Sequence, residues 1–276
     1  MKLYTKIIAT ALFAATTISS AWAGESLDRV MDDKMLTVAT DANWPPMSFL
    51  NDDNVMDGFD VSVAREIGKR LGVDVEFVTP DWGIITAGNW HGRWDISVGS
   101  MTPTKARAEV LSFPGVYYFN PASFAAHEDS PAMTKADLNG KKICAASGST
   151  HEFYLLHDLE IDAVGVPSFE YEVTAGEILA LPGGSDCLTD LRLGDGVRIN
   201  ATLDTLPATI EAIKAGIPIK VVGTPAFYEP LSVAIDKGDA EFDAKLAEII
   251  AAMHADGTIS ELSLKWFDID YSKTAN

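Results

Sequence analysis

Short apolar runs typical of strands alternate along this chain with segments of helical periodicity. Strands are predicted at 36–39, 73–78 and 96–98. Between the first two, Val63, Ile67 and Leu71 recur every four residues and indicate one face of a helix. Asp60 is predicted to cap that helix and Gly72 to end it. The alternation predicts an α/β architecture.

A second series of elements follows the first. Thr102 and Pro103 are predicted as the N-cap and first residue of a helix, and Ser149 and Glu152 have the spacing of a capping box. Further strands are expected at 142–146, 199–203 and 219–222, and helical segments at 242–253 and around 266–267.

The first 23 residues have the pattern of an export signal. Lys2 and Lys6 lie beside an apolar stretch at 7–18, and Ala21 and Ala23 supply small residues at a cleavage site. The apolar stretch, about 12 residues, is too short to span a bilayer of about 30 Å as a helix. We therefore expect residues 1–23 to be a cleaved secretory signal peptide and the mature protein to reside in the periplasm.

Charge and cysteine content narrow the possible partners and chemistry. A formal charge of −19 argues against nucleic acid or an anionic membrane surface as the main partner. In an oxidising compartment, Cys144 and Cys187 favour one disulfide, although two separate buried thiols are the alternative. The five His residues show no metal-binding spacing and are expected at the surface or at helix caps, so no metal or cofactor is predicted.

The chain of 276 residues is longer than one hydrophobic core usually organises, yet no Pro/Ser-rich linker divides it into two domains. One arrangement that fits is a pair of α/β lobes joined by more than one chain crossing, with a ligand cleft between them.

Several residues could bind a ligand in such a cleft. Arg107 lies in the early turns of a predicted helix and could grip a carboxylate, or it could be an ordinary surface arginine. Ser149 and Thr150 offer donors at another helix start, or only cap it. Trp44 and Trp82 follow strands and could stack on a ligand, or fill the core. Packing roles are expected for Trp90, Trp94 and Trp266.

The order and spacing of several motifs resemble the polar amino-acid branch of bacterial periplasmic solute-binding proteins, the receptors of ABC importers. The motifs lie at 40–49, 57–72, 95–107, 113–118, 148–150, 253–258 and 265–267. This resemblance implies a two-lobed type II periplasmic binding protein fold, in which each lobe is a sheet flanked by helices and two hinge crossings join the lobes. It implies that residues 24–118 and 229–276 form lobe 1 and that residues 119–228 form lobe 2.

The resemblance also implies roles for individual residues. Arg107 would bind the α-carboxylate of the ligand, Thr150 would donate from the other lobe, and Asp204 would accept from the α-ammonium. Trp44 and Trp82 would sandwich the ligand's side chain. The full set of expected ligand-binding residues is Asp41, Trp44, Trp82, Gly99, Ser100, Thr102, Arg107, Ser149, Thr150 and Asp204. The Cys144–Cys187 pair resembles a disulfide of the glutamate/aspartate-binding subgroup.

The implied function is that of a monomeric periplasmic receptor that binds a polar or cationic amino acid, or a related zwitterion, and delivers it to a membrane ABC permease. The sequence departs from the family pattern at Gly99, where Ser is frequent, around Asp204, and in the stretch 163–186. The alternative is a periplasmic cyclohexadienyl dehydratase, an enzyme on the same fold. Such an enzyme needs a carboxyl general acid, for which Glu152 and Glu170 are candidates.

Overall fold

The computed structural model describes residues 25–273, so the predicted signal peptide lies outside the described residues. Its strands are β1 (Met35–Ala39), β2 (Asn43–Trp44), β3 (Ser48–Leu50), β4 (Met56–Asp57), β5 (Asp74–Val78), β6 (Ile96–Met101), β7 (Leu111–His127), β8 (Lys142–Ala146), β9 (Glu177–Leu181), β10 (Ala201–Thr205) and β11 (Ile219–Asp236). Its helices are α1 (Glu25–Asp33), α2 (Phe59–Leu71), α3 (Trp82–Thr86), α4 (Lys105–Val110), the 3-10 helix η1 (Lys135–Leu138), α5 (Thr150–Leu155), α6 (Gly184–Leu191), α7 (Leu206–Lys214), α8 (Ala240–Ala255) and α9 (Thr258–Phe267).

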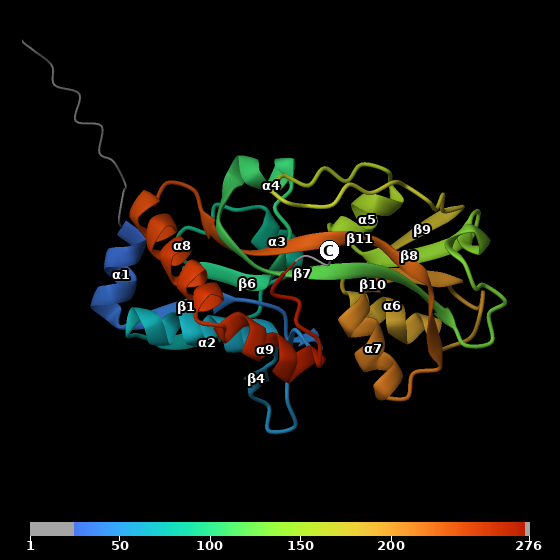
Figure 1. Ribbon diagram of the computed structural model, residues 1–276, viewed down its shortest axis with the longest axis horizontal. Helices are drawn as coiled ribbons and strands as arrows, with labels where there is room; N and C mark the ends of the chain where they lie inside the picture. The colour runs from blue at the N-terminus through green and yellow to red at the C-terminus, as the bar shows by residue number, and fades with distance from the viewer. Residues whose placement is uncertain (1–24, 274–276) are drawn as a thin grey trace, which may run out of the picture.

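Eight strands form one sheet in the order β5-β1-β6-β11-β7-β10-β8-β9, and β2, β3 and β4 form a small separate sheet. β7 and β11 are long antiparallel strands at the centre, and they run through both halves of the molecule (Figure 1). β1 pairs in parallel with β5 and β6 on one side, and β8 pairs in parallel with β9 and β10 on the other. The predicted α/β class is confirmed.

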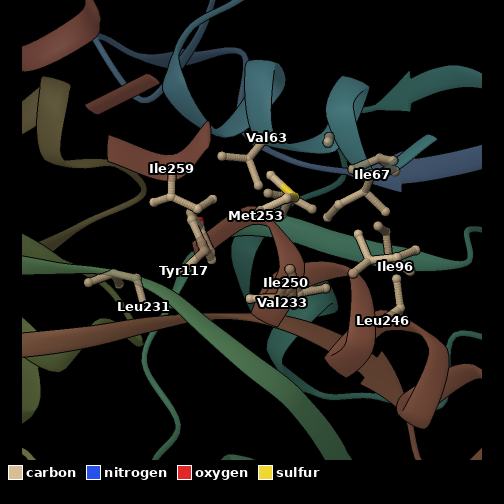
Figure 2. Packing of buried hydrophobic residues seen from close by; sticks show 14 of the residues in the cluster. Val63, Ile67, Ile96, Tyr117, Leu231, Val233, Leu246, Ile250, Met253 and Ile259 are labelled. Atoms are coloured by element: carbon tan, nitrogen blue, oxygen red, sulfur yellow. The ribbon is translucent and has the colours of Figure 1, made fainter. Parts of the chain in front are cut away.

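The two largest hydrophobic cores among the described residues lie along these central strands. Tyr117 on β7 and Leu231 on β11 belong to a core that α2, α8 and α9 cover (Figure 2). Phe124 on β7 and Phe227 on β11 belong to a second core beside β8 and α5. Each long strand therefore leaves one core and enters the other within a few residues. The lobe boundaries at 118 and 228 stay a prediction.

The helix starts correct two sequence predictions. Gly58, with φ of 125°, is the N-cap of α2, whereas Asp60 is buried inside the first turn. A Cβ at Gly58 would stand 2.3 Å from the carbonyl oxygen of Met47, so no other residue fits there. Thr104, not Thr102, caps α4: its hydroxyl accepts a hydrogen bond from the backbone N–H of Arg107. A capping pattern in sequence locates a helix start only to within a turn.

Other predicted boundaries are close to those observed. Gly72 ends α2 in the left-handed conformation, as predicted. Ser149 caps α5, but the Glu152 carboxylate accepts from the backbone N–H of Gly148 rather than closing a capping box on Ser149. β11 is far longer than the predicted strand at 219–222, because its second half pairs with β7 in the first core.

Candidate functional site

All ten residues expected from the sequence to bind a ligand line one pocket between the two halves of the molecule. The lining residues are Asp41, Trp44, Trp82, Gly99, Ser100, Thr102, Arg107, Ala146, Ser149, Thr150, His151, Pro182, Gly183, Gly184, Asp204 and Glu229. They come from segments far apart in the sequence, which the central strands bring together. That each of the ten contacts a ligand stays a prediction.

Arg107 is buried in this pocket rather than lying on the surface. It is 5% exposed, and its guanidinium donates to the backbone carbonyl oxygens of Thr102 and Gly148, each at 2.9 Å. The same guanidinium lies over the ring of Trp82, 5.2 Å from its centroid. Burial lowers the pKa of Arg107 to about 10, while the Glu229 carboxylate acts in the opposite direction. Arg107 therefore stays cationic at neutral pH.

Glu229 is the centre of a buried network in the pocket. It is 2% exposed, and its Oε1 atom accepts hydrogen bonds from the hydroxyls of Thr102, at 2.9 Å, and of Thr150. Its Oε2 atom forms an ion pair with His151 Nε2 at 3.3 Å. Burial alone would raise the pKa of Glu229, but the attraction of His151 and these hydrogen bonds outweigh burial and lower it. Glu229 is therefore ionised.

His151 corrects the expectation that every His lies at the surface or at a helix cap. It is in the first turn of α5, 5% exposed, and its ring faces the Glu229 carboxylate. Burial lowers the pKa of His151, but its interaction with Glu229 more than compensates, so that the pKa is raised above its ordinary value of 6.5.

Asp204, at the end of β10, contributes a second buried carboxylate. Its Oδ1 atom accepts a hydrogen bond from the backbone N–H of Thr205 at 2.7 Å, and Oδ2 accepts none of ordinary geometry from the described residues. Burial raises the pKa of Asp204, and the charge of His151 partly opposes that effect. A Cβ added at Gly184 would stand 2.2 Å from Oδ2, so this glycine leaves room for the carboxylate.

Ser100 is held in a strained conformation by a buried network behind the pocket. Its φ is 50°, which is uncommon for a residue other than glycine. Its hydroxyl donates to the Asp60 carboxylate at 2.8 Å and lies 2.6 Å from the Tyr118 hydroxyl, while Tyr117 donates to Asp60 at 2.8 Å. Burial raises the pKa of Asp60 to about 7. The Ser100 hydroxyl is thus engaged within the protein, although the residue lines the pocket.

The remaining predicted residues form the mouth and rim. Trp44 and Trp82 are both half-buried, and the Trp82 indole N–H donates to the Gly148 carbonyl oxygen at 3.3 Å. Asp41 is exposed, and its carboxylate accepts from the backbone N–H of Asn43 at 2.7 Å. The Ser149 hydroxyl donates to the Ala146 carbonyl oxygen at 2.6 Å, and its oxygen accepts from the backbone N–H of Glu152 to cap α5, so both of its functions are used within the protein.

The predicted disulfide is confirmed. Cys144 on β8 and Cys187 on α6 are bonded and fully buried. The bond fixes α6, which begins at Gly184, beside the strand that leads into the turn at 148–150. A covalent link therefore holds together two segments that line the pocket.

Glu229 and His151 were missed by the sequence analysis, but each left a weak signal. Glu229 interrupts the apolar run Phe227–Leu231, where a lone acidic residue in a buried strand needs a partner. His151 directly follows Thr150, at the start of a predicted helix whose first residues are expected to bind a ligand. What could not be read from the sequence was that the two side chains meet.

Neither glutamate considered for the dehydratase alternative lines the pocket. Within residues 25–273, no cluster of three or more His, Cys, Asp or Glu side chains could hold a metal ion. No helix in that same range is long and apolar enough to cross a membrane.

Comparisons with known proteins give a consistent result. Residues 36–269 match the family described as bacterial extracellular solute-binding proteins, family 3. The chain is 28% identical over 270 residues to the L-cystine-binding protein TcyJ of Escherichia coli K12, covering 97% of this chain and 95% of that protein. It is 28% identical over 249 residues to the L-arginine-binding protein of Pseudomonas aeruginosa, covering 89% and 92%.

The fold also matches that of solved structures. One is the ancestral amino acid-binding protein AncCDT-1, a precursor of cyclohexadienyl dehydratase. The TM-score is 0.74 at 29% identity, and the match covers 88% of this chain and 99% of that one.

Proposed function

Because the chain belongs to family 3 of the bacterial extracellular solute-binding proteins and has their two-lobed type II fold, we propose that it is a receptor for a polar or cationic amino acid. A related zwitterion is the other ligand that this pocket suits. The receptor binds its ligand between the two lobes, closes over it, and delivers it to the membrane permease of an ABC importer. It works as a monomer in the periplasm, to which residues 1–23 direct it.

The observation that carries this proposal is the separation of charge within one pocket. Arg107 supplies a buried cation with donors in a planar fork, which suits a carboxylate. Asp204 and Glu229 supply buried carboxylates in the same pocket, which suit an ammonium group. In a free amino acid the carboxylate and the ammonium group are attached to the same carbon atom. One ligand can therefore bind the basic and the acidic side of the pocket at once.

The relatives support this ligand class. The proteins from Escherichia coli and Pseudomonas aeruginosa are named for binding cystine and arginine, both of which are α-amino acids. Trp44 and Trp82 at the mouth offer flat faces to the ligand's side chain, and Asp41 offers a carboxylate to its polar end. These features favour arginine, lysine, ornithine, histidine or glutamine.

Ligand contacts to both lobes favour closure, because only the closed form completes them. Charge-assisted hydrogen bonds contribute roughly 1.5–3 kcal/mol each. A few of them, after the cost of ordering, are enough for about −8 kcal/mol, the free energy of a micromolar complex.

A thermal-shift screen of those five amino acids and of osmolytes such as betaines tests the proposal. A ligand at about 100 times its dissociation constant stabilises the protein by roughly 2.7 kcal/mol. Calorimetry on Arg107→Ala should then show that binding is abolished. The free variant should still show a cooperative thermal unfolding transition, which means that it is folded. Undiminished affinity in that variant would rule the proposal out.

The dehydratase alternative ranks second. Its support is the likeness to AncCDT-1, which is itself described as an amino acid-binding protein. We propose that this chain is not an enzyme, since Glu152 and Glu170 lie outside the pocket lining. Incubation with prephenate or arogenate, followed by detection of an aromatic product, separates the two functions.

A further inference from the structure

We infer that Glu229 determines specificity for the α-ammonium group of the ligand. It binds this group and so selects amino acids over acids that lack it. The inference rests on the proposed function, in which the pocket binds a free amino acid. It assigns the ammonium end to a group of acceptors around Glu229. We call this group, Thr102, Thr150, Asp204 and Glu229, the acceptor cluster.

The directions of the hydrogen bonds carry the argument. A threonine hydroxyl has one proton, and Thr102 and Thr150 both direct theirs to Oε1 of Glu229. With their protons engaged, these hydroxyls present only lone pairs to a ligand. They cannot donate to a carboxylate while this network stands, but they can accept from an ammonium group. Thr102 and Thr150 could otherwise donate to a ligand carboxylate. Because their protons are hydrogen-bonded to Glu229, they act as acceptors instead.

The other members of the cluster point to the same ligand group. Asp204 Oδ2 is buried in the pocket and accepts no hydrogen bond of ordinary geometry from the described residues. A carboxylate offers about four acceptor positions, and the described contacts of Glu229 use three of them, two with threonine hydroxyls and one with His151. An ammonium group, with three donors and no acceptor, matches this cluster.

The ionisable groups of the pocket explain why a ligand without an α-ammonium group is disfavoured. Two buried basic side chains, Arg107 and His151, and two buried acidic ones, Asp204 and Glu229, line the pocket. A zwitterion adds no net charge to these groups. An acid without the ammonium adds an uncompensated negative charge near two carboxylates and leaves their acceptors unpaired, which is costly in a buried site.

The position of Glu229 distinguishes it from the other lining residues. It lies on β11, between Phe227 of one core and Leu231 of the other. Thr102 follows β6 in the first half, and Thr150 begins α5 in the second. Both reach the same oxygen atom, so the acceptor cluster assembles only when the halves are close together.

Calorimetry with matched pairs of ligands tests this inference. The probes are the tightest binder among arginine, lysine, ornithine, histidine and glutamine, and the 2-hydroxy acid of the same skeleton, which has a hydroxyl in place of the α-ammonium. Glu229→Gln should weaken binding of the amino acid by about ten- to hundredfold and change the affinity for the hydroxy acid less than about threefold. The preference for the amino acid then falls by at least about threefold.

The matched control is Glu152→Gln. Glu152 is in the same helix turn as His151 and accepts from the Gly148 N–H, but it does not line the pocket. This variant should keep the preference of the wild type. Glu229→Asp, which keeps the charge but shortens the side chain by one methylene, should lose part of the preference and provides the measurement if the Gln variant does not fold.

The outcomes separate the inference from the proposed function. A wild-type protein that binds none of the five amino acids overturns the proposed function, and the inference with it. A wild-type protein that binds one of them, with Glu229 variants that weaken both probes equally, overturns the inference alone, because Glu229 would then serve only to hold the two halves together.

Discussion

The guanidinium of Arg107 donates a hydrogen bond to the backbone carbonyl oxygen of Gly148, with 2.9 Å between nitrogen and oxygen. Arg107 is on α4 in one half of the molecule, and Gly148 is in the turn between β8 and α5 in the other. The Trp82 indole donates to the same oxygen at 3.3 Å. The arginine expected to grip the ligand is thus also a direct link between the halves.

Arg107→Lys should weaken amino-acid binding by at least about tenfold, although the charge is kept. Arg107 donates to two carbonyl oxygens, of Thr102 and Gly148, and its remaining donors can still reach a carboxylate in a fixed plane. A lysine ammonium has three donors at one point and cannot serve all of these directions. Calorimetry with the amino acid selected by the thermal-shift screen measures the loss.

Arg93→Lys is the matched control for that change. The Arg93 guanidinium lies over the ring of Trp94 at 4.8 Å, much as Arg107 lies over Trp82, but it is outside the pocket. Its replacement should leave the affinity unchanged. Equal effects of the two substitutions would show that Arg107 acts only through general stability.

A second link between the halves lies outside the pocket. Thr104, the N-cap of α4, forms an isolated antiparallel bridge with Ile161 in the loop after α5. The backbone N–H of Asp162 donates to the Pro103 carbonyl oxygen at 2.9 Å. This bridge holds the start of the helix that carries Arg107, and it breaks when the halves move apart.

Asp162→Pro should therefore raise the dissociation constant by about two- to tenfold. Proline has no N–H group, so the variant loses the hydrogen bond to Pro103, worth about 0.5–1.5 kcal/mol, in the closed form only. Val164→Pro is the control: Val164 is 99% exposed and precedes Gly165, whose φ of 81° suits a turn that accepts proline at the preceding position. The prediction fails if both variants bind as the wild type does in calorimetry.

Asp60 should make the stability of the protein fall as the pH rises from about 4 to about 7. Burial raises the pKa of this carboxyl to about 7 in the folded protein, from the ordinary value of 3.8 that holds after unfolding. Between these values the unfolded chain releases the proton first, so the folded state loses up to about 1.4 kcal/mol of stability per pH unit from this group. Below both values, and above both, the effect is constant.

Urea denaturation of the wild type and of Asp60→Asn at several pH values isolates this effect from the other titrating groups. The wild-type free energy of unfolding minus that of the variant should decrease over the interval from pH 4 to pH 7. A difference that is flat across the interval means that Asp60 titrates near its ordinary pKa in the folded protein.

Local pattern in the sequence was sufficient for much of the fold. The apolar residues Val63, Ile67 and Leu71 share the buried face of α2, and Gly72 ends that helix, because both features depend on a few neighbouring residues. The residues expected to form the site do line one pocket, but that expectation came from the family resemblance. Spacing alone favoured an ordinary surface role for Arg107, which the structure contradicts by burying it.

The interpretation of single polar residues failed where distant contacts decide their role. The apolar period that follows Asp60 predicts a helix cap at this residue, yet Tyr117 and Ser100 donate hydrogen bonds to its carboxylate in the core. Glu229 accepts a hydrogen bond from Thr150, which is 79 residues away in the sequence. No local sequence pattern predicts that these two residues meet. Pairings of this kind are set by the sheet topology, which the sequence pattern does not specify.

Gly184→Ala should weaken ligand binding. Gly184 is the first residue of α6. The added Cβ would lie 2.2 Å from Oδ2 of Asp204, so this carboxylate must leave its position in the pocket. Calorimetry should show a loss of about tenfold or more, since one charged hydrogen bond to the ammonium is lost.

Gly183→Ala separates this effect from a general disturbance of α6. Gly183 also lines the pocket, but a Cβ there would meet only the Asp186 carboxylate at 3.6 Å, an ordinary contact. This neighbouring variant should bind with nearly the affinity of the wild type. If Gly184→Ala binds equally well while its melting temperature is unchanged or higher, Asp204 does not contact the ligand, and the ammonium end of the pocket belongs to Glu229 alone.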